Sequence, residues 1–499
     1  MELQFHKSLI DCLQPVLQQM QTQELTQEVR LTEGMPDVGK VVGAWGQVLL
    51  RGKQWSGNSA GVSGGIMAWV VYLPEDGSEA RCMETWLPLQ MKWDVPDAER
   101  DGSICVMPRL QGIDARCVSA RKLMVRATAA MQADAYVPAQ VELYEAQDLP
   151  EDLRALKHQY PVQLPKEVGE KAFSLEETIQ LPAESMPMQK LLRYTLRPEL
   201  TDKKVMTDKL IFRGNAWLDI LYRGTDGQIY GHQHEMPFSQ YADLDREYDS
   251  TAEAQVCFAV TNLEVEQAEE DGISVKVGMI AQYAVKERTL VELIQDSYSP
   301  KREVTPVIEQ LKLPTVLEDK TQTLSADLSA NSDCLRLIDT VFYPGQSAVY
   351  RESDAVGAEF SGTYQILGYD GEGQLRSETH PWNGTWSVPA DSDSRVSLTV
   401  EPIGKARGSV AGGTADMTAD MQLHWQTTAQ NGMPMVTGLE IGEEKKPDPN
   451  RPSLILRRAD KDSLWDIAKQ SGSDVEQIQK LNNLQQDPMQ DQMLLIPVL

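Results

Sequence analysis

Apolar and polar residues alternate along most of the chain, in short runs that turn residues separate. One such run, residues 67–72, reads Met-Ala-Trp-Val-Val-Tyr and is followed by the turn dipeptide Asp76-Gly77. Because successive side chains of a strand point to opposite faces, alternation predicts strands, and Asp-Gly predicts tight turns between antiparallel neighbours. The pattern therefore predicts a mainly β protein.

The strand pattern recurs at an interval of about 150 residues. Trp69, Trp217 and Tyr364 occupy matching places, and an Asp-Gly dipeptide follows each of them. We expect these aromatic residues to anchor a core or a sheet face, with stacking on a sugar as the less favoured role. The recurrence predicts three tandem β-rich repeats. Their expected limits are residues 25–140, 175–290 and 324–440.

Near the end of the chain the apolar spacing changes to a helical period. Leu454–Arg458 reads as a short strand, and Asp462 is placed to cap a helix that begins directly after it. Gly472 can end this helix in the left-handed conformation, and a second short helix precedes a closing strand at Met493–Ile496. Residues 453–499 are thus predicted to form a small βααβ domain.

Two further segments lie outside these domains. Residues 1–24 place Leu9, Leu13 and Leu17 on one helical stripe among Gln-rich positions. This spacing predicts an amphipathic N-terminal helix that packs on the first repeat or binds a partner. Residues 441–452 are rich in charge and proline, which predicts an exposed and fairly stiff linker.

At Ser463–Ala468, Gly472 and Leu481–Leu484, the terminal segment resembles the LysM family. That family binds N-acetylglucosamine-containing glycans such as peptidoglycan, in a groove between the loop before the first helix and the loop after the second. The resemblance implies a ligand- or partner-binding groove here. Its residues would be Asp462, Ser463, Leu464, Trp465, Asn482, Asn483, Leu484 and Pro488.

The segment departs from the family pattern in two loops that border this groove. Asp460-Lys461 and Gln490-Asp491 stand where the family usually has Pro-Gly. Glycine would let the backbone approach a sugar closely. Without it, the sequence does not decide between a glycan and a protein as the ligand. Trp465 lies at the edge of the first helix's apolar stripe. This position is compatible with contact to a ligand and equally with partial packing in the core.

Three β repeats before a LysM-like end resemble the SPOCS-domain proteins of spore-forming bacteria, in particular the clostridial family of spore coat morphogenetic proteins. The resemblance covers roughly residues 25–440 by pattern and order. It implies a non-enzymatic scaffold or adaptor of spore coat or spore envelope assembly, located in the mother-cell cytoplasm at the forespore surface. The LysM end would dock on a coat-layer protein, such as the spore coat ATPase. The alternative is a peptidoglycan-binding protein of the cell envelope.

Composition limits the partners. Lys and Arg total 47 against 74 Asp and Glu, and the net charge of −27 disfavours nucleic acid and anionic lipid surfaces. No apolar run approaches the roughly 18 residues that a membrane span needs, and no secretory signal is visible at the N-terminus. We therefore expect no nucleic-acid partner and no membrane span.

Candidate catalytic and metal-binding residues are few. Ser59 and Ser63 each lie in a Gly-x-Ser-x-Gly pattern, but the glycines around them disfavour the helix that must follow a nucleophilic serine. His232 and His234 lie on one strand face, and two ligands do not complete a zinc site. We expect no enzyme activity, no metal and no cofactor, and a flexible hairpin loop at residues 55–65.

Overall fold

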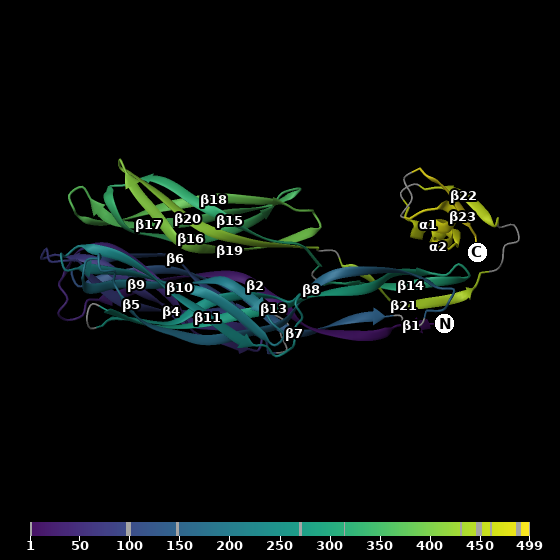
Figure 1. Ribbon diagram of the computed structural model, residues 1–499, viewed down its shortest axis with the longest axis horizontal. Coiled ribbons are helices and arrows are strands. Elements are labelled where there is room, and N and C mark those ends of the chain that lie inside the picture. The colour runs from purple at the N-terminus through teal and green to yellow at the C-terminus, as the bar shows by residue number, and fades with distance from the viewer. Residues whose placement is uncertain are drawn as a thin grey trace.

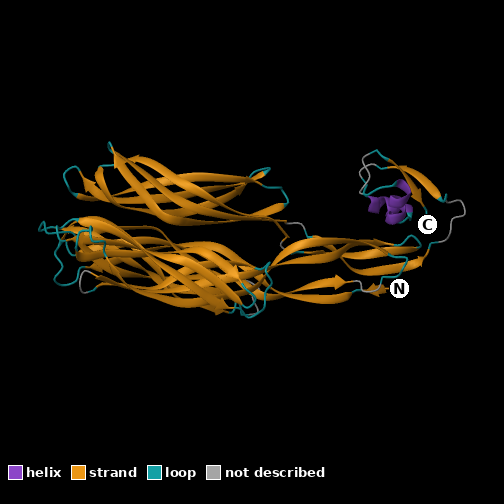
Figure 2. Cartoon of the chain, in the orientation of Figure 1, coloured by secondary structure: helices purple, strands orange, loops and turns teal. Residues whose placement is uncertain are grey.

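Strands make up most of the computed structural model, and the two helices among the residues that it describes lie near the C-terminus (Figure 2). The mainly β fold is therefore confirmed. The described residues are 2–95, 101–145, 149–268, 272–313, 315–429, 432–445, 452–459, 462–485 and 491–498.

Each repeat consists of six antiparallel strands in two three-stranded sheets, with the same strand order in all three repeats. In the first repeat the sheets have the orders β3-β4-β5 and β2-β7-β6. Its strands are β2 (His6–Arg30), β3 (Val38–Ser56), β4 (Ser59–Pro74), β5 (Arg81–Asp94), β6 (Ser103–Ser119) and β7 (Lys122–Glu145).

The second repeat pairs its strands in the orders β9-β10-β11 and β8-β13-β12, and the third in the orders β16-β17-β18 and β15-β20-β19. The strands of the second are β8 (Arg154–Gln180), β9 (Met188–Val205), β10 (Lys209–Gly224), β11 (Ile229–Asp243), β12 (Glu253–Gln267) and β13 (Gly272–Tyr298). Those of the third are β15 (Thr315–Asn331), β16 (Cys334–Arg351), β17 (Ala355–Asp370), β18 (Leu375–Pro389), β19 (Ser394–Ala411) and β20 (Thr414–Ala429).

The three matching aromatic residues lie on the middle strands of equivalent sheets, β4, β10 and β17. Trp69 and Tyr364 are buried, and Trp217 is half-buried. The ring of Trp69 lies 4.9 Å from that of Tyr194 in an edge-on arrangement, so it joins the first repeat to the second. Tyr364 belongs to the core of its own repeat. One position of the repeat thus serves two different packing roles.

The predicted N-terminal helix over residues 1–24 was wrong. Residues 2–4 form β1 (Glu2–Gln4), and β2 continues from His6 to Arg30, paired along its whole length with β7. The ladder with β7 satisfies the backbone groups that a helix would have paired internally, so tertiary pairing overrides the helical spacing of the leucines. Pro15 lies at a register shift of this ladder, where a missing N–H is tolerated.

The segments between repeats are strands as well. β7 extends beyond residue 140, β8 crosses residue 175, β13 extends beyond residue 290 and β15 crosses residue 324. The expected limits of the repeats therefore fall inside strands. Residues 441–444 of the predicted linker belong to β21 (Met433–Glu444), and residues 446–451 lie outside the described residues.

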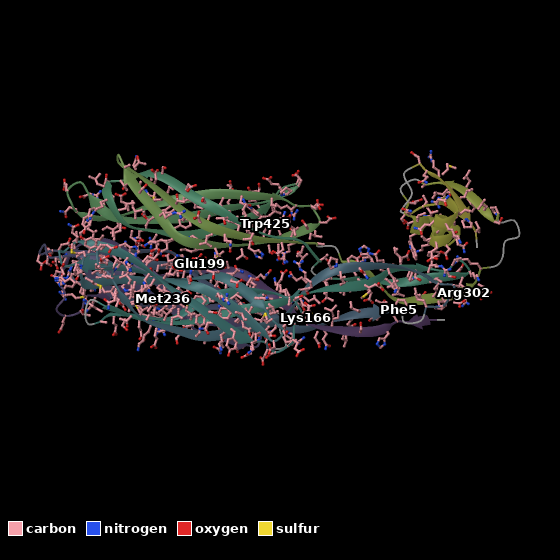
Figure 3. All side chains as sticks on the ribbon, in the orientation of Figure 1. Phe5, Lys166, Glu199, Met236, Arg302 and Trp425 are labelled. Carbon is pink, nitrogen blue, oxygen red and sulfur yellow. The ribbon has the colours of Figure 1, made fainter. Side chains whose placement is uncertain are left out.

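A narrower stalk projects from the body that the three repeats form (Figure 1). We use the name stalk for the sheet β1-β21-β14, with β14 at Arg302–Leu311, together with the outer ends of β2, β7, β8 and β13. Figure 3 shows Lys166 where the stalk leaves the body, and Phe5 and Arg302 along it. Phe5 is buried in an apolar cluster of the stalk, which gives this extension a core of its own.

The terminal domain lies beside the far end of the stalk (Figure 1). It has the predicted order, and its first and last strands pair antiparallel. Its elements are β22 (Leu454–Arg458), α1 (Leu464–Ser471), α2 (Val475–Asn482) and β23 (Met493–Pro497).

Buried charges join the three repeats. Arg193 of β9 forms an ion pair with Asp339 of β16 at 2.8 Å, and both side chains are at most 3% exposed. Lys405 of β19 lies 3.2 Å from Asp339 and 2.8 Å from Asp219 of β10. The guanidinium carbon of Arg193 lies 5.3 Å from the ring centre of Trp45, on β3 of the first repeat. One cluster thus contains side chains from every repeat.

Three glutamines add hydrogen bonds from one repeat to the backbone of another. Gln282 of the second repeat accepts from the N–H of Val106 at 2.9 Å and donates to its carbonyl at 2.7 Å. Gln47 of the first repeat accepts from the N–H of Leu196 in the second, and Gln365 of the third donates to a carbonyl of the first. Because such side chains imitate a strand partner, they fix the register between repeats.

Replacing Asp339 by Asn tests the cluster. Burial pushes the pKa of Asp339 upward, but Arg193 and Lys405 outweigh burial and hold this pKa below its usual range. At pH 7 the change should lower the free energy of unfolding by about 3–5 kcal/mol, because it leaves the buried guanidinium of Arg193 without a carboxylate. The charge of Asp339 stabilises the fold above the ordinary aspartate pKa of about 4 and ceases to do so as the pH falls through its lower folded pKa.

Urea unfolding at pH 7 and at acidic pH measures this difference. The control is Arg407→Ala, which removes an ion pair with Asp420 on an exposed surface. It should change the unfolding free energy by at most about 1 kcal/mol. Equal effects of the two substitutions at pH 7 would show that the buried cluster does not hold the repeats together.

Candidate functional site

Ser463, not Asp462, caps the first helix of the terminal domain. The Ser463 hydroxyl accepts from the N–H of Asp466, and the Asp466 carboxylate accepts from the N–H of Ser463, which makes a complete capping box. Asp462 instead forms an ion pair with Arg457 of β22 at 2.5 Å. The expected cap was therefore one residue too early, because a helix that begins at Leu464 needs its capping oxygen on the residue before it.

Gly472 ends α1 with a φ of 60°, as the sequence predicts. Leu464 is 2% exposed and packs in the domain core with Ile467 and Ile478. A side chain buried so completely cannot contact a ligand without unfolding the helix. Leu464 is therefore a core residue at the base of the expected groove.

The loop after α2 is held by Asn482. Its side-chain amide donates to the carbonyls of Ile478 and Leu495 at 2.8 and 2.7 Å, and its oxygen accepts from the N–H of Leu495 at 2.8 Å. These bonds tie α2 to β23. Asn483 follows in the left-handed conformation at φ 53° and is exposed.

Leu484 and Pro488 complete the set of expected groove residues. Leu484 is half-buried and packs against the domain core. Pro488 lies outside the described residues. Asp491, where the family usually has glycine, adopts a φ of 67°, so the left-handed backbone is retained without the residue that favours it.

The polar groups expected to hold a ligand are thus largely engaged inside the domain. Ser463 is used in the capping box, Asp462 pairs with Arg457, and the amide of Asn482 holds β23. These internal bonds hold the loops that border the expected groove in place.

A mainly apolar surface lies on the outer side of the two-stranded sheet. In the two strands every second residue is exposed, and Leu456 lies directly opposite Leu495 in the ladder. The alternate residues Leu494 and Ile496 are buried. We call this outer surface the sheet face. It consists of Leu454 (47% exposed), Leu456 (62%), Met493 (52%) and Leu495 (37%), with Arg458 opposite Met493 at its edge.

Trp465 points at the stalk and not at the groove. Its ring lies 4.8 Å from that of Tyr298 in an edge-on arrangement, and its Nε1–H donates to Asp296 at 2.8 Å. Both partners lie at the end of β13. The sequence reasoning missed Asp296 and Tyr298 because nothing in the local pattern distinguishes them from other polar and aromatic strand residues.

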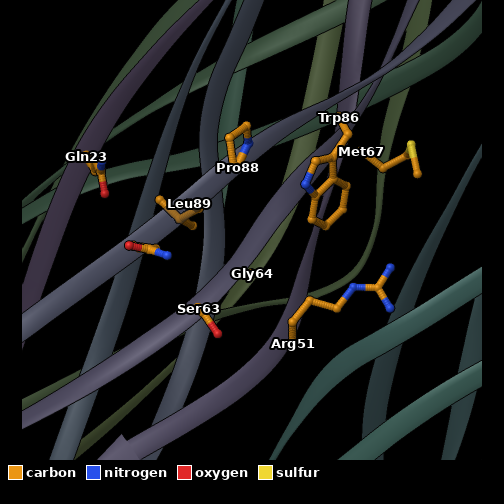
Figure 4. A pocket seen from close by; sticks show the side chains of 9 residues that line it. Gln23, Arg51, Ser63, Gly64, Met67, Trp86, Pro88 and Leu89 are labelled. Atoms are coloured by element: carbon orange, nitrogen blue, oxygen red, sulfur yellow. The ribbon is translucent and has the colours of Figure 1, made fainter.

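A separate open groove of about 790 Å³ lies on the first repeat (Figure 4). Ser63 lines it beside Trp86, whose ring lies 5.4 Å from the guanidinium carbon of Arg51. Among the described residues of its lining there is no carboxylate, imidazole or thiol that could deprotonate Ser63. Residues 59–65 belong to strand β4 and pair with both β3 and β5, so the expected flexible loop is reduced to a hairpin turn at residues 57–58.

In the part of the chain that the structure describes, His232 and His234 do not belong to a cluster of metal-binding side chains. His234 bonds to Glu177 at 3.0 Å, and burial lowers the pKa of His232. Within the described ranges there is no group of three or more His, Cys, Asp or Glu residues that could hold a metal ion. No helix of the described residues is long and apolar enough to cross a membrane.

Comparison with protein families gives two matches. Residues 187–268, which span β9 to β12, match the SipL SPOCS domain, and residues 460–497 match the LysM domain. The chain thus contains a SPOCS domain and a C-terminal LysM domain. The LysM match ends at the last residue of β23 and begins just before α1, so it covers both helices and the groove loops.

Searches of curated proteins and of solved structures find no match. The SPOCS match lies within the second repeat, whose strand order the first and third repeats share. The two matched domains are of binding or adaptor type.

Replacing Asn482 by Ala should weaken the LysM domain. It removes the side-chain partner of the N–H and the carbonyl of Leu495, at a cost of about 0.5–1.5 kcal/mol for each exposed hydrogen bond. Amide hydrogen exchange of α2 and β23 measures the loss. Asn483→Gly is the matched control, because glycine suits a φ of 53° and should leave protection almost unchanged. Equal loss of protection in both variants would contradict the structural role of Asn482.

Proposed function

We propose that this protein is a non-enzymatic scaffold of spore coat or spore envelope assembly, and that its LysM domain docks on a coat-layer protein. The SPOCS and LysM matches support a sporulation-associated role. The three β repeats supply a rigid body, and the stalk carries the docking domain away from it (Figure 1). The partner would be the spore coat ATPase, and the protein would work on the mother-cell side of the forespore surface.

The observation that supports a protein ligand is a difference between two surfaces of the LysM domain, the groove and the sheet face. Groove polar groups are engaged in internal hydrogen bonds, whereas the sheet face exposes four large apolar side chains. A contiguous exposed apolar patch on a small domain is typical of a protein-binding surface. The net charge of −27 further favours a basic partner, because opposite charges speed and orient association.

The LysM match also favours a second candidate, binding of peptidoglycan through N-acetylglucosamine. Asn483 and the loop before α1 are the surfaces that a glycan would reach. On this alternative the full protein should sediment with purified peptidoglycan, and substitutions on the sheet face should not matter. Sedimentation with peptidoglycan and no binding to the coat ATPase would decide for the glycan.

Leu456→Glu combined with Leu495→Glu tests protein docking. The two carboxylates would be buried in the complex without partners, so affinity for the purified spore coat ATPase should fall at least about tenfold. Isothermal titration calorimetry measures the change. Leu317→Glu is the matched control, because Leu317 is 56% exposed on the third repeat, far from the sheet face in sequence. Unchanged affinity in the double variant would exclude the sheet face as the docking surface.

The place of action gives an independent test. A fluorescent fusion of the protein should form a ring around the developing forespore in the mother cell. Deleting residues 453–499 should disperse that ring, because the docking domain is lost while the repeats keep their own cores. Localisation to the septum of vegetative cells would contradict a role in coat assembly.

A further inference from the structure

The LysM domain is held to the tip of the stalk by a set of specific side-chain contacts. Lys469 of α1 donates to both oxygens of Asp296, at 2.8 and 2.7 Å, and the indole of Trp465 shares the second of these oxygens. Arg154 at the start of β8 donates to the carboxylate of Asp474 at 2.6 Å. Each charged group in this contact is therefore matched by an opposite charge on the other side.

Aromatic packing completes the contact. Tyr298 is 4% exposed and belongs to the same apolar cluster as Leu464 and Ile467 of the LysM domain. Its hydroxyl donates to the carbonyl of Ser473 at 3.0 Å. The stalk tip, which we define as Arg154, Asp296 and Tyr298, thus supplies a ring to the core of the neighbouring domain.

The backbone of β13 places these groups for the contact. The ladder with β8 shifts register between Ile294 and Asp296, where one residue of β13 has no partner. A bulge of this kind redirects the side chains that follow it. Asp296 and Tyr298, two residues apart on a strand, then lie on one face and reach Trp465 together.

We propose that Trp465, Lys469 and Asp474 form a second recognition surface, the helical surface, which the stalk tip occupies in the free protein. The stalk tip acts as a built-in ligand and shows the chemistry that this surface accepts. An external partner would be a protein strand with a carboxylate and, two residues later, an aromatic ring, and with a guanidinium beside them. Such a partner must displace the stalk tip, so the helical surface is available only when this contact opens.

This surface differs from the sheet face in residues and in chemistry. The sheet face is mainly apolar and exposed, whereas the helical surface combines an indole with two opposite charges and is partly covered. The contact restrains the helical side of the domain and leaves the sheet face uncovered. If docking through the sheet face were disproved, the proposal for the helical surface would still stand, and the reverse also holds.

Oxidative labelling of Trp465 in the full chain, followed by peptide mapping, measures how often the contact opens. In Asp296→Ala the labelling rate should rise about tenfold, since a hydrogen-bonded charged partner is lost. Glu292→Ala is the matched control, because Glu292 lies on the same strand and pairs with Lys157 instead. Raising the ionic strength should increase labelling of the wild type, because the ion pairs are partly exposed and are screened.

A synthetic peptide of residues 290–302 serves as the external partner, because it contains Asp296 and Tyr298. The full-length Asp296→Ala variant should bind it at least about tenfold more tightly than the wild type, whose own stalk tip competes at high effective concentration. A control peptide with Asn and Ala at those two positions should bind correspondingly less. Unchanged labelling of Trp465 in Asp296→Ala, or no preference between the two peptides, would overturn the proposal.

Discussion

The ion pair between Arg193 and Asp339 is the constraint on which the arrangement of the repeats depends. Both groups are almost completely removed from water, so each is tolerable only while the other is present. The buried pair of charges fixes the third repeat against the second, and Trp45 of the first repeat packs on the same guanidinium. The glutamines that bond to neighbouring backbones then set the register between repeats.

That fixed body explains how a small domain can be presented at a distance. β8 and β13 belong to the second repeat at one end and to the stalk tip at the other, and they stay paired between these ends across two register shifts. The position of the LysM domain is therefore set by the same strands that build the repeat. A flexible tether would leave the domain free to rotate, whereas contacts through Arg154, Asp296 and Tyr298 restrain it.

The sequence predicts those features of the fold that depend on residues close together along the chain. The repeated aromatic positions, the Asp-Gly turns and the helical period of the last residues are local signals, and they predict the β fold, the threefold recurrence and the βααβ domain. The predicted helix over residues 1–24 was wrong because leucines at helical spacing also fit a strand with one partly covered face. Pro15 inside that stretch argues against a helix. The stalk tip has no local signal at all, since Asp296 meets Trp465 only after two distant segments have folded. The roles of Ser463 and Asn482 likewise depend on which neighbours claim their polar atoms.

The ladder between β21 and β14 has a mechanical consequence, because β21 precedes the LysM domain along the chain. It runs from Glu444 opposite Arg302 to Met433 opposite Leu311, with its hydrogen bonds perpendicular to the strands. A pull on the LysM domain along the stalk loads these bonds in shear, so that many must break together, whereas a pull across the stalk would open them one at a time. A layer assembled from such molecules would resist stretching along the stalk and yield to peeling across it.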